Sequence, residues 1–273
     1  MSGSPEHPLL RQLGDLARAA GQAILDIYHS DFEVEIKHDR SPLTEADLAA
    51  QRVIMAGLTA LDARVPVVSE EACNADWEQR RQWDRYWLVD PLDGTREFVK
   101  RNGEFSVNIA LIENHRPVLG VVLAPVGGEL YAAASGHGAW FQAAADAPWQ
   151  RMGTRALARP AILAGSRSHG GDGQRIARRL LGEDYQLQAL GSSLKFCLIA
   201  RGAADLYLRY GPTCEWDTAA AQCVLEEAGG AVTDLQGRAL RYNRGESLIN
   251  PEFMAVGDRS IDWAQRLREA DTD

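Results

Sequence analysis

The order of strand-like and helix-like stretches changes near the middle of this 273-residue chain, and that change constrains the fold most. In the first half, FSVNIALIE (105–113) and PVLGVVLAP (117–125) read as strands joined by a short turn, and two more strands flank a turn at 136–138. In the second half, AILAG, YQLQAL and ADLYLR alternate with helical stretches. The pattern predicts a sheet that is largely a meander, followed by a sheet flanked by helices.

Helical periodicity marks the elements that cover these sheets. Apolar residues recur at helical spacing from Leu9 to Tyr28, and a second helix begins after Thr44, a good N-cap residue. Further elements are expected as helices at 173–181, 192–202 and 216–227, a strand at 253–256 and a helix at 261–270. A polar, turn-rich stretch places a loose boundary near residue 150. We therefore expect a layered α/β (α+β) fold with an N-terminal α+β half (1–150) and a C-terminal α/β half (151–273).

Composition restricts the partners. The formal net charge is −9, which argues against nucleic acid, because non-specific binding to nucleic acid needs a basic surface. No apolar run approaches the ~20 residues that span a bilayer, and the N-terminus lacks the pattern of a signal peptide. Four cysteines show no metal-binding spacing and are expected as free thiols. We expect a cytoplasmic protein without stable membrane insertion; peripheral contact with the inner membrane and the oligomeric state stay open.

Residues 87–98, WLVDPLDGTREF, end an apolar strand in two carboxylates, a proline and a glycine. Because proline cannot donate to a strand ladder, we expect the strand to end at Asp90 and a turn to carry Asp93. Gly94 allows unusual backbone angles, and a short helix from Thr95 onward would offer free amides to an anion. Asp93 alone could be an ordinary turn residue, whereas Asp90, closing an apolar strand, needs a partner.

Carboxylates close other elements in the same way. Glu70 and Glu71 follow a short β-branched run, and Asp217 stands at the start of an apolar helix. Each acid taken singly has another explanation: a solvated loop for Glu70 and Glu71, an N-cap for Asp217, and a capping box with Thr44 for Asp47. Gathered together, such carboxylates need hard cations to neutralise them, and a set of oxygen ligands favours Mg²⁺ over zinc.

The segments WLVDPLDGT, SEEA upstream and EWDTAAA downstream together resemble the lithium-sensitive, Mg²⁺-dependent inositol monophosphatase superfamily, over nearly the whole chain. The resemblance implies an αβαβα sandwich with two sheets. Four stretches are similar to the CysQ-type 3′(2′),5′-bisphosphate nucleotidases within it: DGTREF (93–98), SPLTEAD (41–47), AGSRSH (164–169) and GSSLKFCLIARGAADLYLR (191–209). Those enzymes remove the 3′-phosphate of 3′-phosphoadenosine 5′-phosphate, a by-product of sulfate activation. The resemblance therefore implies a nucleotide phosphatase of sulfur assimilation.

The resemblance also implies a set of metal ligands at the matching positions. Glu70, Asp90 and the backbone carbonyl of Leu92 would bind one Mg²⁺. Asp90, Asp93 and Asp217 would bind a second, with two or three Mg²⁺ in the complete site. Two metals of this kind clamp the attacking and leaving oxygens of an in-line displacement.

Catalytic and phosphate-binding roles follow from the same resemblance. Thr95, paired with Asp47, would activate the water nucleophile, and Asp47 would keep its capping role as well. The amides of Gly94 and Thr95 would hold the scissile phosphate. Asp217 would also contact the substrate and position the water that protonates the leaving ribose oxygen.

The remaining phosphate and the base need contacts of their own. We expect Ser168 and His169 in one loop, and Ser192 with Lys195 at the start of a helix, to supply them. The alternatives are an ordinary loop position for His169 and a solvated helix position for Lys195.

Two other functions stay open at this point. An inositol monophosphatase or another sugar-phosphate phosphatase would share the metal core, and the segments around Arg96, Ser168 and Lys195 favour the nucleotide instead. A regulatory or binding protein on a phosphatase fold belongs to a different class, and the loss of one metal ligand would favour it. The residues expected to hold the metals and the nucleophile are all present in this chain: Glu70, Asp90, Asp93, Thr95 and Asp217.

Overall fold

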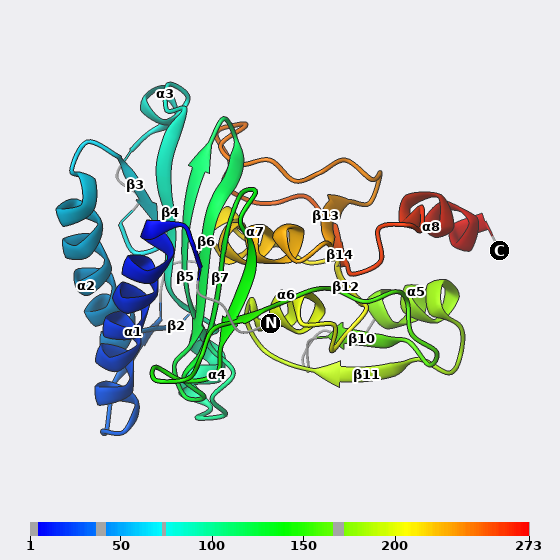
Figure 1. The fold of residues 1–273 in the computed structure, drawn as a ribbon, viewed down its shortest axis with the longest axis horizontal. Coiled ribbons are helices and arrows are strands. Elements are labelled where there is room, and N and C mark those ends of the chain that lie inside the picture. The colour runs from blue at the N-terminus through cyan, green and yellow to red at the C-terminus, as the bar shows by residue number, and fades with distance from the viewer. Residues whose placement is uncertain (1–4, 37–41, 73–74, 166–171, 273) are drawn as a thin grey trace.

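The computed structural model of the chain describes residues 5–36, 42–72, 75–165 and 172–272. Its elements stack as helices, sheet, helices, sheet and helices (Figure 1), which confirms the layered fold with two main sheets. The helices are α1 (Pro8–Tyr28), α2 (Glu45–Asp62), α3 (Trp77–Arg80), α4 (Thr95–Val99), α5 (Asp172–Leu181), α6 (Leu194–Ala200), α7 (Ala219–Glu227), α8 (Trp263–Thr272) and the 3₁₀ helix η1 (Glu215–Asp217).

Consecutive strands form the first main sheet, as the meander pattern predicted. Its order is β3-β4-β5-β6-β7-β8-β9, and all neighbours are antiparallel except β3 and β4, which are parallel. The bounds of its strands are β3 (Val67–Ser69), β4 (Arg85–Asp93), β5 (Ser106–Glu113), β6 (Arg116–Ala124), β7 (Glu129–Ala134), β8 (Gly138–Gln142) and β9 (Gln150–Arg151).

The second main sheet has the order β11-β10-β12-β14-β13. Here β10 runs parallel to both of its neighbours, whereas β14 is antiparallel to β12 and β13. The bounds are β10 (Ile162–Gly165), β11 (Gln186–Ala189), β12 (Leu206–Arg209), β13 (Ala231–Asp234) and β14 (Phe253–Val256). A separate hairpin pairs β1 (Val34–Ile36) with β2 (Pro42–Thr44) before α2 begins.

Apolar side chains fill the spaces between the five layers. One cluster joins α1 and α2 to the first sheet, a second lies between the two sheets around α6 and α7, and a third joins the second sheet to α5 and α8. The central cluster contains Leu88 from β4 as well as Phe196 from α6 and Val224 from α7. Both halves of the chain contribute side chains to this central cluster, so the cluster does not mark a division between them. The boundary near Gln150 therefore stays a prediction. Among the described residues, no helix is long and apolar enough to cross a membrane.

The structure corrects the expectation that the first acidic strand ends at Asp90. Strand β4 continues to Asp93, because a bulge lies between Asp90, which pairs with Asn108, and Asp93, which pairs with Ser106. Three residue steps on β4 therefore face two on β5. The bulge leaves Pro91 outside the ladder, so its missing N–H costs no strand hydrogen bond.

The helix expected at 216–227 is also divided. The short 3₁₀ helix η1 carries Asp217, and the α-helix α7 begins only at Ala219, with Thr218 as its N-cap. Asp217 is therefore not the N-cap of α7, which removes one of the alternative explanations for this acid.

Candidate active site

Parallel pairing of β3 with β4 brings the first two acids together. Ser69 is in register with Val89, and the N–H of Glu70 donates to the Val89 carbonyl at 3.2 Å. Glu70 and Asp90 therefore follow residues that are in register on two neighbouring strands. This pairing places the two acids side by side, each directly after a buried stretch of its strand.

The bulge in β4 fixes the second acid. The Asp90 carboxylate accepts a hydrogen bond from the Leu92 N–H at 3.0 Å, and its side chain is only 1% exposed. This local bond holds the bulge shut and orients the carboxylate. The tight backbone that follows requires glycine: Gly94 has φ of +95°, and a Cβ there would lie 3.2 Å from the Glu104 carbonyl oxygen.

Thr95 begins α4 and contacts the acid on α2. Its Oγ1 lies 3.2 Å from Asp47 Oδ1 and 3.3 Å from the Leu92 carbonyl oxygen. A hydroxyl carries one proton, so it donates to only one of these oxygens at a time. The predicted Thr95–Asp47 pair is therefore in hydrogen-bond contact across 48 positions of sequence.

Asp47 also completes the capping box predicted for α2. Its Oδ2 accepts from both the N–H and the Oγ1 of Thr44 at 2.8 Å, and Thr44 Oγ1 accepts from the Ala46 N–H. The two explanations for Asp47 are compatible, because Oδ2 serves the helix terminus and Oδ1 faces Thr95. The capping box holds the buried carboxylate in one orientation toward α4.

The second half of the chain supplies one acid to this site. Asp217 lies in η1, and its Oδ2 accepts from the Cys214 N–H at 2.9 Å. The neighbouring Glu215 anchors η1 from behind, because both of its carboxylate oxygens accept from the Asn243 N–H at 2.9 Å. Desolvation raises the pKa of Glu215 to about 7, although the Asn243 N–H and the charge of Arg80 oppose the shift.

Glu70, Asp90 and Asp217 meet as one cluster. One carboxylate oxygen from each lies within 4.8 Å of the others, which is close enough for a shared metal ion. Burial raises the pKa of Asp90 well above its ordinary value, and the charges of Glu70 and Asp93 raise it further. Burial also raises the pKa of Asp217, with Asp93 and Glu70 adding to the effect. Both shifts have the same physical causes, which are burial and the charges of the neighbouring carboxylates.

Asp93 lies at the edge of this cluster and faces the second half of the chain. Its Oδ2 accepts from the Ser193 N–H. Burial raises its pKa to about 6, whereas the Lys195 ammonium and the Ser193 N–H lower it. The charge of Asp93 is thus partly balanced by groups of the second half.

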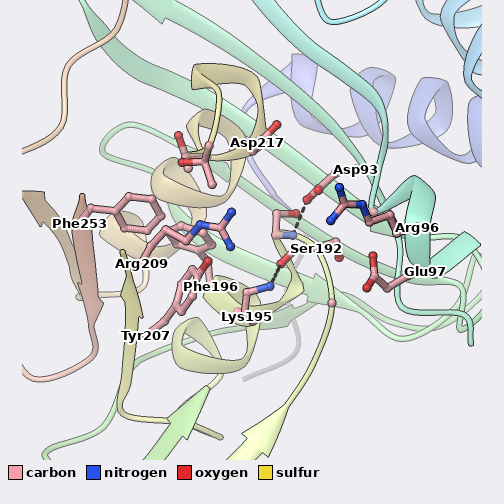
Figure 2. A pocket seen from close by; sticks show the side chains of 15 residues that line it. Asp93, Arg96, Glu97, Ser192, Lys195, Phe196, Tyr207, Arg209, Asp217 and Phe253 are labelled. Carbon is pink, nitrogen blue, oxygen red and sulfur yellow. Dashed lines mark hydrogen bonds between the residues drawn. The ribbon is translucent and has the colours of Figure 1, made fainter. Parts of the chain in front are cut away.

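A cavity of about 160 Å³ opens beside Asp93 and Asp217. Figure 2 shows Arg96 and Glu97 on one wall, with Arg209, Tyr207 and Phe253 opposite. Of the predicted contacts, the cavity lining includes Gly94, Ser192 and Lys195 as well as the two aspartates. The predicted contacts Ser168 and His169 lie outside the described residues.

The structure shows that the solvated position considered for Lys195 is wrong. Its side chain is 5% exposed, because α6 lies between the two sheets, and Nζ donates to the carbonyls of Ser192 at 2.6 Å and Leu190 at 3.3 Å. Burial lowers the pKa of Lys195 to about 8, while Asp93 raises it. These bonds shape the turn in which Ser192 has φ of +52°.

Several cavity residues had no place among the predicted contacts. Arg209, Tyr207 and Phe253 come from the second sheet, and Arg96 and Glu97 come from the first turn of α4. Arg209 ends the apolar strand β12, and a cation at the end of a buried strand is a signal that could have identified it. Phe253 offers no such signal, because an apolar strand residue resembles any other member of the core.

Known proteins resemble this chain over most of its length. The sequence matches the profile of the Inositol monophosphatase family over residues 6–263. The 3′(2′),5′-bisphosphate nucleotidase CysQ of Shigella flexneri is 49% identical over 252 residues, which cover 90% of this chain and 98% of that protein. The protein of the same name from Salmonella typhimurium is 50% identical over 247 residues, with the same two coverages. The crystal structure of CysQ from Bacteroides thetaiotaomicron has a TM-score of 0.79 at 40% identity, covering 91% of this chain and 97% of that one.

The family match spans the positions of all the described acids of the site. The matches to CysQ proteins confirm the resemblance to the CysQ-type branch that the segments around Asp93 and Lys195 indicated. They also confirm the expected fold, because the similarity extends over both main sheets. The chain therefore belongs to the inositol monophosphatase family.

Proposed function

We propose that this protein is a 3′(2′),5′-bisphosphate nucleotidase, a phosphoric monoester hydrolase that converts 3′-phosphoadenosine 5′-phosphate to AMP and phosphate. The observation that carries the proposal is 49% identity over nine tenths of the chain with a protein of that name. The cluster of Glu70, Asp90 and Asp217 beside a cavity supports it, because phosphoryl transfer depends on positioning and charge stabilisation more than on covalent groups. The reaction belongs to sulfur assimilation and to the cytoplasm.

The acid cluster fits Mg²⁺. All of its donor atoms are carboxylate oxygens, and the cluster is partly buried. Burial and neighbouring carboxylates raise the pKa values of Asp90 and Asp217, and a divalent cation would offset that repulsion. We assign Glu70, Asp90 and the Leu92 carbonyl to one ion, and Asp90, Asp93 and Asp217 to a second, in a site for two or three ions. When bound, the ions supply positive charge for the phosphate oxygens and lower the pKa of a water molecule.

The residues of α4 and α2 act on the phosphate and the attacking water. The amides of Gly94 and Thr95 face the scissile phosphate at the start of α4. The Thr95 hydroxyl, 3.2 Å from Asp47, orients the water, and the Asp47 carboxylate holds the proton that the water loses. Asp217 orients the water that returns a proton to the leaving ribose oxygen.

The cavity beside Asp93 receives the nucleoside and its second phosphate. Ser192 and Lys195 contribute one side of it, and Ser168 and His169 complete the set of proposed contacts. Lys195 acts mainly by position, because its ammonium already donates to two backbone carbonyls and adds a positive charge beneath the turn. The aromatic rings of Tyr207 and Phe253 give the cavity an apolar wall suited to a base.

Phosphate release with Mg²⁺ tests the proposal. We would compare 3′-phosphoadenosine 5′-phosphate, inositol 1-phosphate and fructose 1,6-bisphosphate under identical conditions. A kcat/KM that strongly favours the nucleotide is expected. A preference for either sugar phosphate would keep the metal site and refute the nucleotide assignment.

A second measurement on the same protein distinguishes an enzyme from a binding protein that hydrolyses no substrate. Mg²⁺ must raise the melting temperature if it binds the native state, whether or not the protein turns over. A Mg²⁺-dependent rise without phosphate release from any of the three substrates would favour a regulatory role. We expect both the rise and the release.

A further inference from the structure

We propose that the guanidinium of Arg96 binds the substrate phosphate that is not hydrolysed, which makes Arg96 a residue that determines specificity for bisphosphates. The inference rests on the proposed function, because it concerns the second phosphate of the same substrate. It comes from comparing three cations, Arg96, Lys195 and Arg209, that line the cavity beside Asp93.

The donors of Lys195 are directed into the protein. Its Nζ donates to the carbonyls of Ser192 and Leu190, and it lies 5.1 Å from the centre of the Tyr207 ring. Binding a phosphate strongly would require the buried ammonium to give up contacts that shape its own turn. Lys195 therefore adds long-range charge more than a direct contact.

Arg209 is committed in a similar way. Its Nε donates to the Gly211 carbonyl at 3.0 Å, and one terminal nitrogen donates to the Pro212 carbonyl at 2.7 Å. These bonds use one complete edge of the guanidinium to close the turn after β12. A guanidinium can bind a phosphate through two parallel hydrogen bonds from one edge. On this edge of Arg209, both nitrogens already donate to backbone carbonyls.

Arg96 differs from both. It is exposed and stands directly after Thr95, and its guanidinium has no hydrogen-bond or ion-pair partner among residues 5–36, 42–72, 75–165 and 172–272. Figure 2 shows its side chain directed from α4 toward the cavity. A guanidinium presents five N–H donors in a planar arrangement that matches phosphate oxygens, and here all five are available to a ligand.

Charge balance explains why a cation is needed on this wall. Asp93, Glu97 and Asp217 line the same cavity, so a second phosphate entering it meets carboxylates. Metal ions held by the acid cluster would balance Asp217 and the neighbouring Asp93, but Glu97 lies beside Arg96 and outside that cluster. Arg96 offsets this repulsion for a substrate with two phosphates, whereas a monophosphate gains nothing from it.

The test compares Arg96→Ala with two matched variants, Arg96→Lys and Lys100→Ala. Lys100 is the exposed C-cap residue of the same helix and does not line the cavity, so its removal controls for the lost charge. For each protein, kcat/KM would be measured with Mg²⁺ on 3′-phosphoadenosine 5′-phosphate and on adenosine 3′-phosphate, which lacks the second phosphate. Inhibition by AMP and by adenosine would be measured in parallel.

We expect Arg96→Ala to lose about 10- to 100-fold on the bisphosphate, mostly through KM, since a charge-assisted hydrogen bond is removed. The loss on adenosine 3′-phosphate should be at least about tenfold smaller, and inhibition by AMP should weaken more than inhibition by adenosine. Arg96→Lys should lie between wild type and Arg96→Ala, because it keeps the charge and loses the two parallel hydrogen bonds. Lys100→Ala should behave as wild type.

Equal losses on the two nucleotides, or an equal loss in Lys100→Ala, would overturn the role of Arg96. This result is distinct from failure of the proposed function, which would appear as a wild-type protein that releases no phosphate from either nucleotide. A wild type that prefers the bisphosphate, together with an Arg96→Ala variant that keeps the same preference, would refute Arg96 alone.

Discussion

Replacing Asp90 with asparagine should stabilise the metal-free protein while it abolishes activity. Asp90 is buried, and an oxygen of its carboxylate lies within 4.8 Å of oxygens from Glu70 and Asp217. Asparagine keeps an oxygen that accepts from the Leu92 N–H, so the bulge in β4 is preserved. The substitution removes the central charge of the cluster and changes the packing little.

The magnitude follows from Coulomb's law. Two unit charges 4.8 Å apart repel by ~3 kcal/mol at an effective dielectric constant of ~20. Proton uptake relieves part of this repulsion at neutral pH, because the pKa of Asp90 is raised. A net gain of about 1–3 kcal/mol therefore remains, which corresponds to a rise of a few degrees in melting temperature.

The assay is thermal unfolding in EDTA and in Mg²⁺, together with phosphate release. Asp90→Asn should melt at a higher temperature than wild type in EDTA, should respond less to Mg²⁺, and should release no phosphate. The matched control is Asp205→Asn, since Asp205 is equally buried but paired with Arg155 at 2.8 Å. That variant should be less stable in both buffers. An Asp90→Asn protein that is less stable in EDTA, or that keeps its full Mg²⁺ response, would refute the reasoning.

Three further predictions test the same site. Thr95→Ala should lower kcat by about 100-fold or more and leave the Mg²⁺-dependent rise in melting temperature intact, because the hydroxyl orients water through its contact with Asp47; Thr95→Ser should restore part of the rate, and unchanged kinetics would contradict this role. Asp93→Asn should abolish activity, and in EDTA its stability relative to wild type should grow with pH. In wild type the pKa of Asp93 is about 6 in the folded state and ~3.9 in the unfolded state. The Asp93 carboxyl therefore stabilises the folded protein fully below pH ~3.9, and this contribution is lost as the pH rises through the folded-state pKa. A pH-independent difference would contradict the shift. Li⁺ in the millimolar range should inhibit phosphate release, as the family resemblance implies, and resistance would weaken the two-ion assignment.

Local sequence signals predicted the parts of the site that depend on local geometry. Thr44 and Asp47 stand three positions apart, which is the spacing of a capping box, and the structure forms that box. The strand-like run before Glu70 and the run before Asp90 form neighbouring parallel strands in which Ser69 pairs with Val89. Such features need only a helix start or the end of an apolar strand, and both leave direct traces in the order of residues.

The errors arose where tertiary contacts override a local rule. A proline normally ends a strand, but β4 has a bulge after Asp90, and Pro91 lies in this bulge without a ladder hydrogen bond. Only the pairing of β4 with β5 shows this. The division of the 216–227 helix depends on Glu215, whose carboxylate is held by Asn243 from a distant segment. Neither contact is visible within a window of a few residues.

Lys195 shows why polarity alone could not assign the second half of the site. A lysine on a short helix ordinarily marks the solvent face, and this alternative to the predicted phosphate contact is wrong because α6 is almost entirely buried. The helix lies between two sheets, so Leu194, Lys195 and Phe196 are all buried. Burial then forces the ammonium to find carbonyl partners nearby, which turns a candidate phosphate ligand into a support for the turn around Ser192. Of the three cations that line the cavity among the described residues, only Arg96, exposed on α4, has a side chain without a hydrogen-bond partner. Which cation meets the substrate is therefore decided by the layers of the fold and not by the residue type.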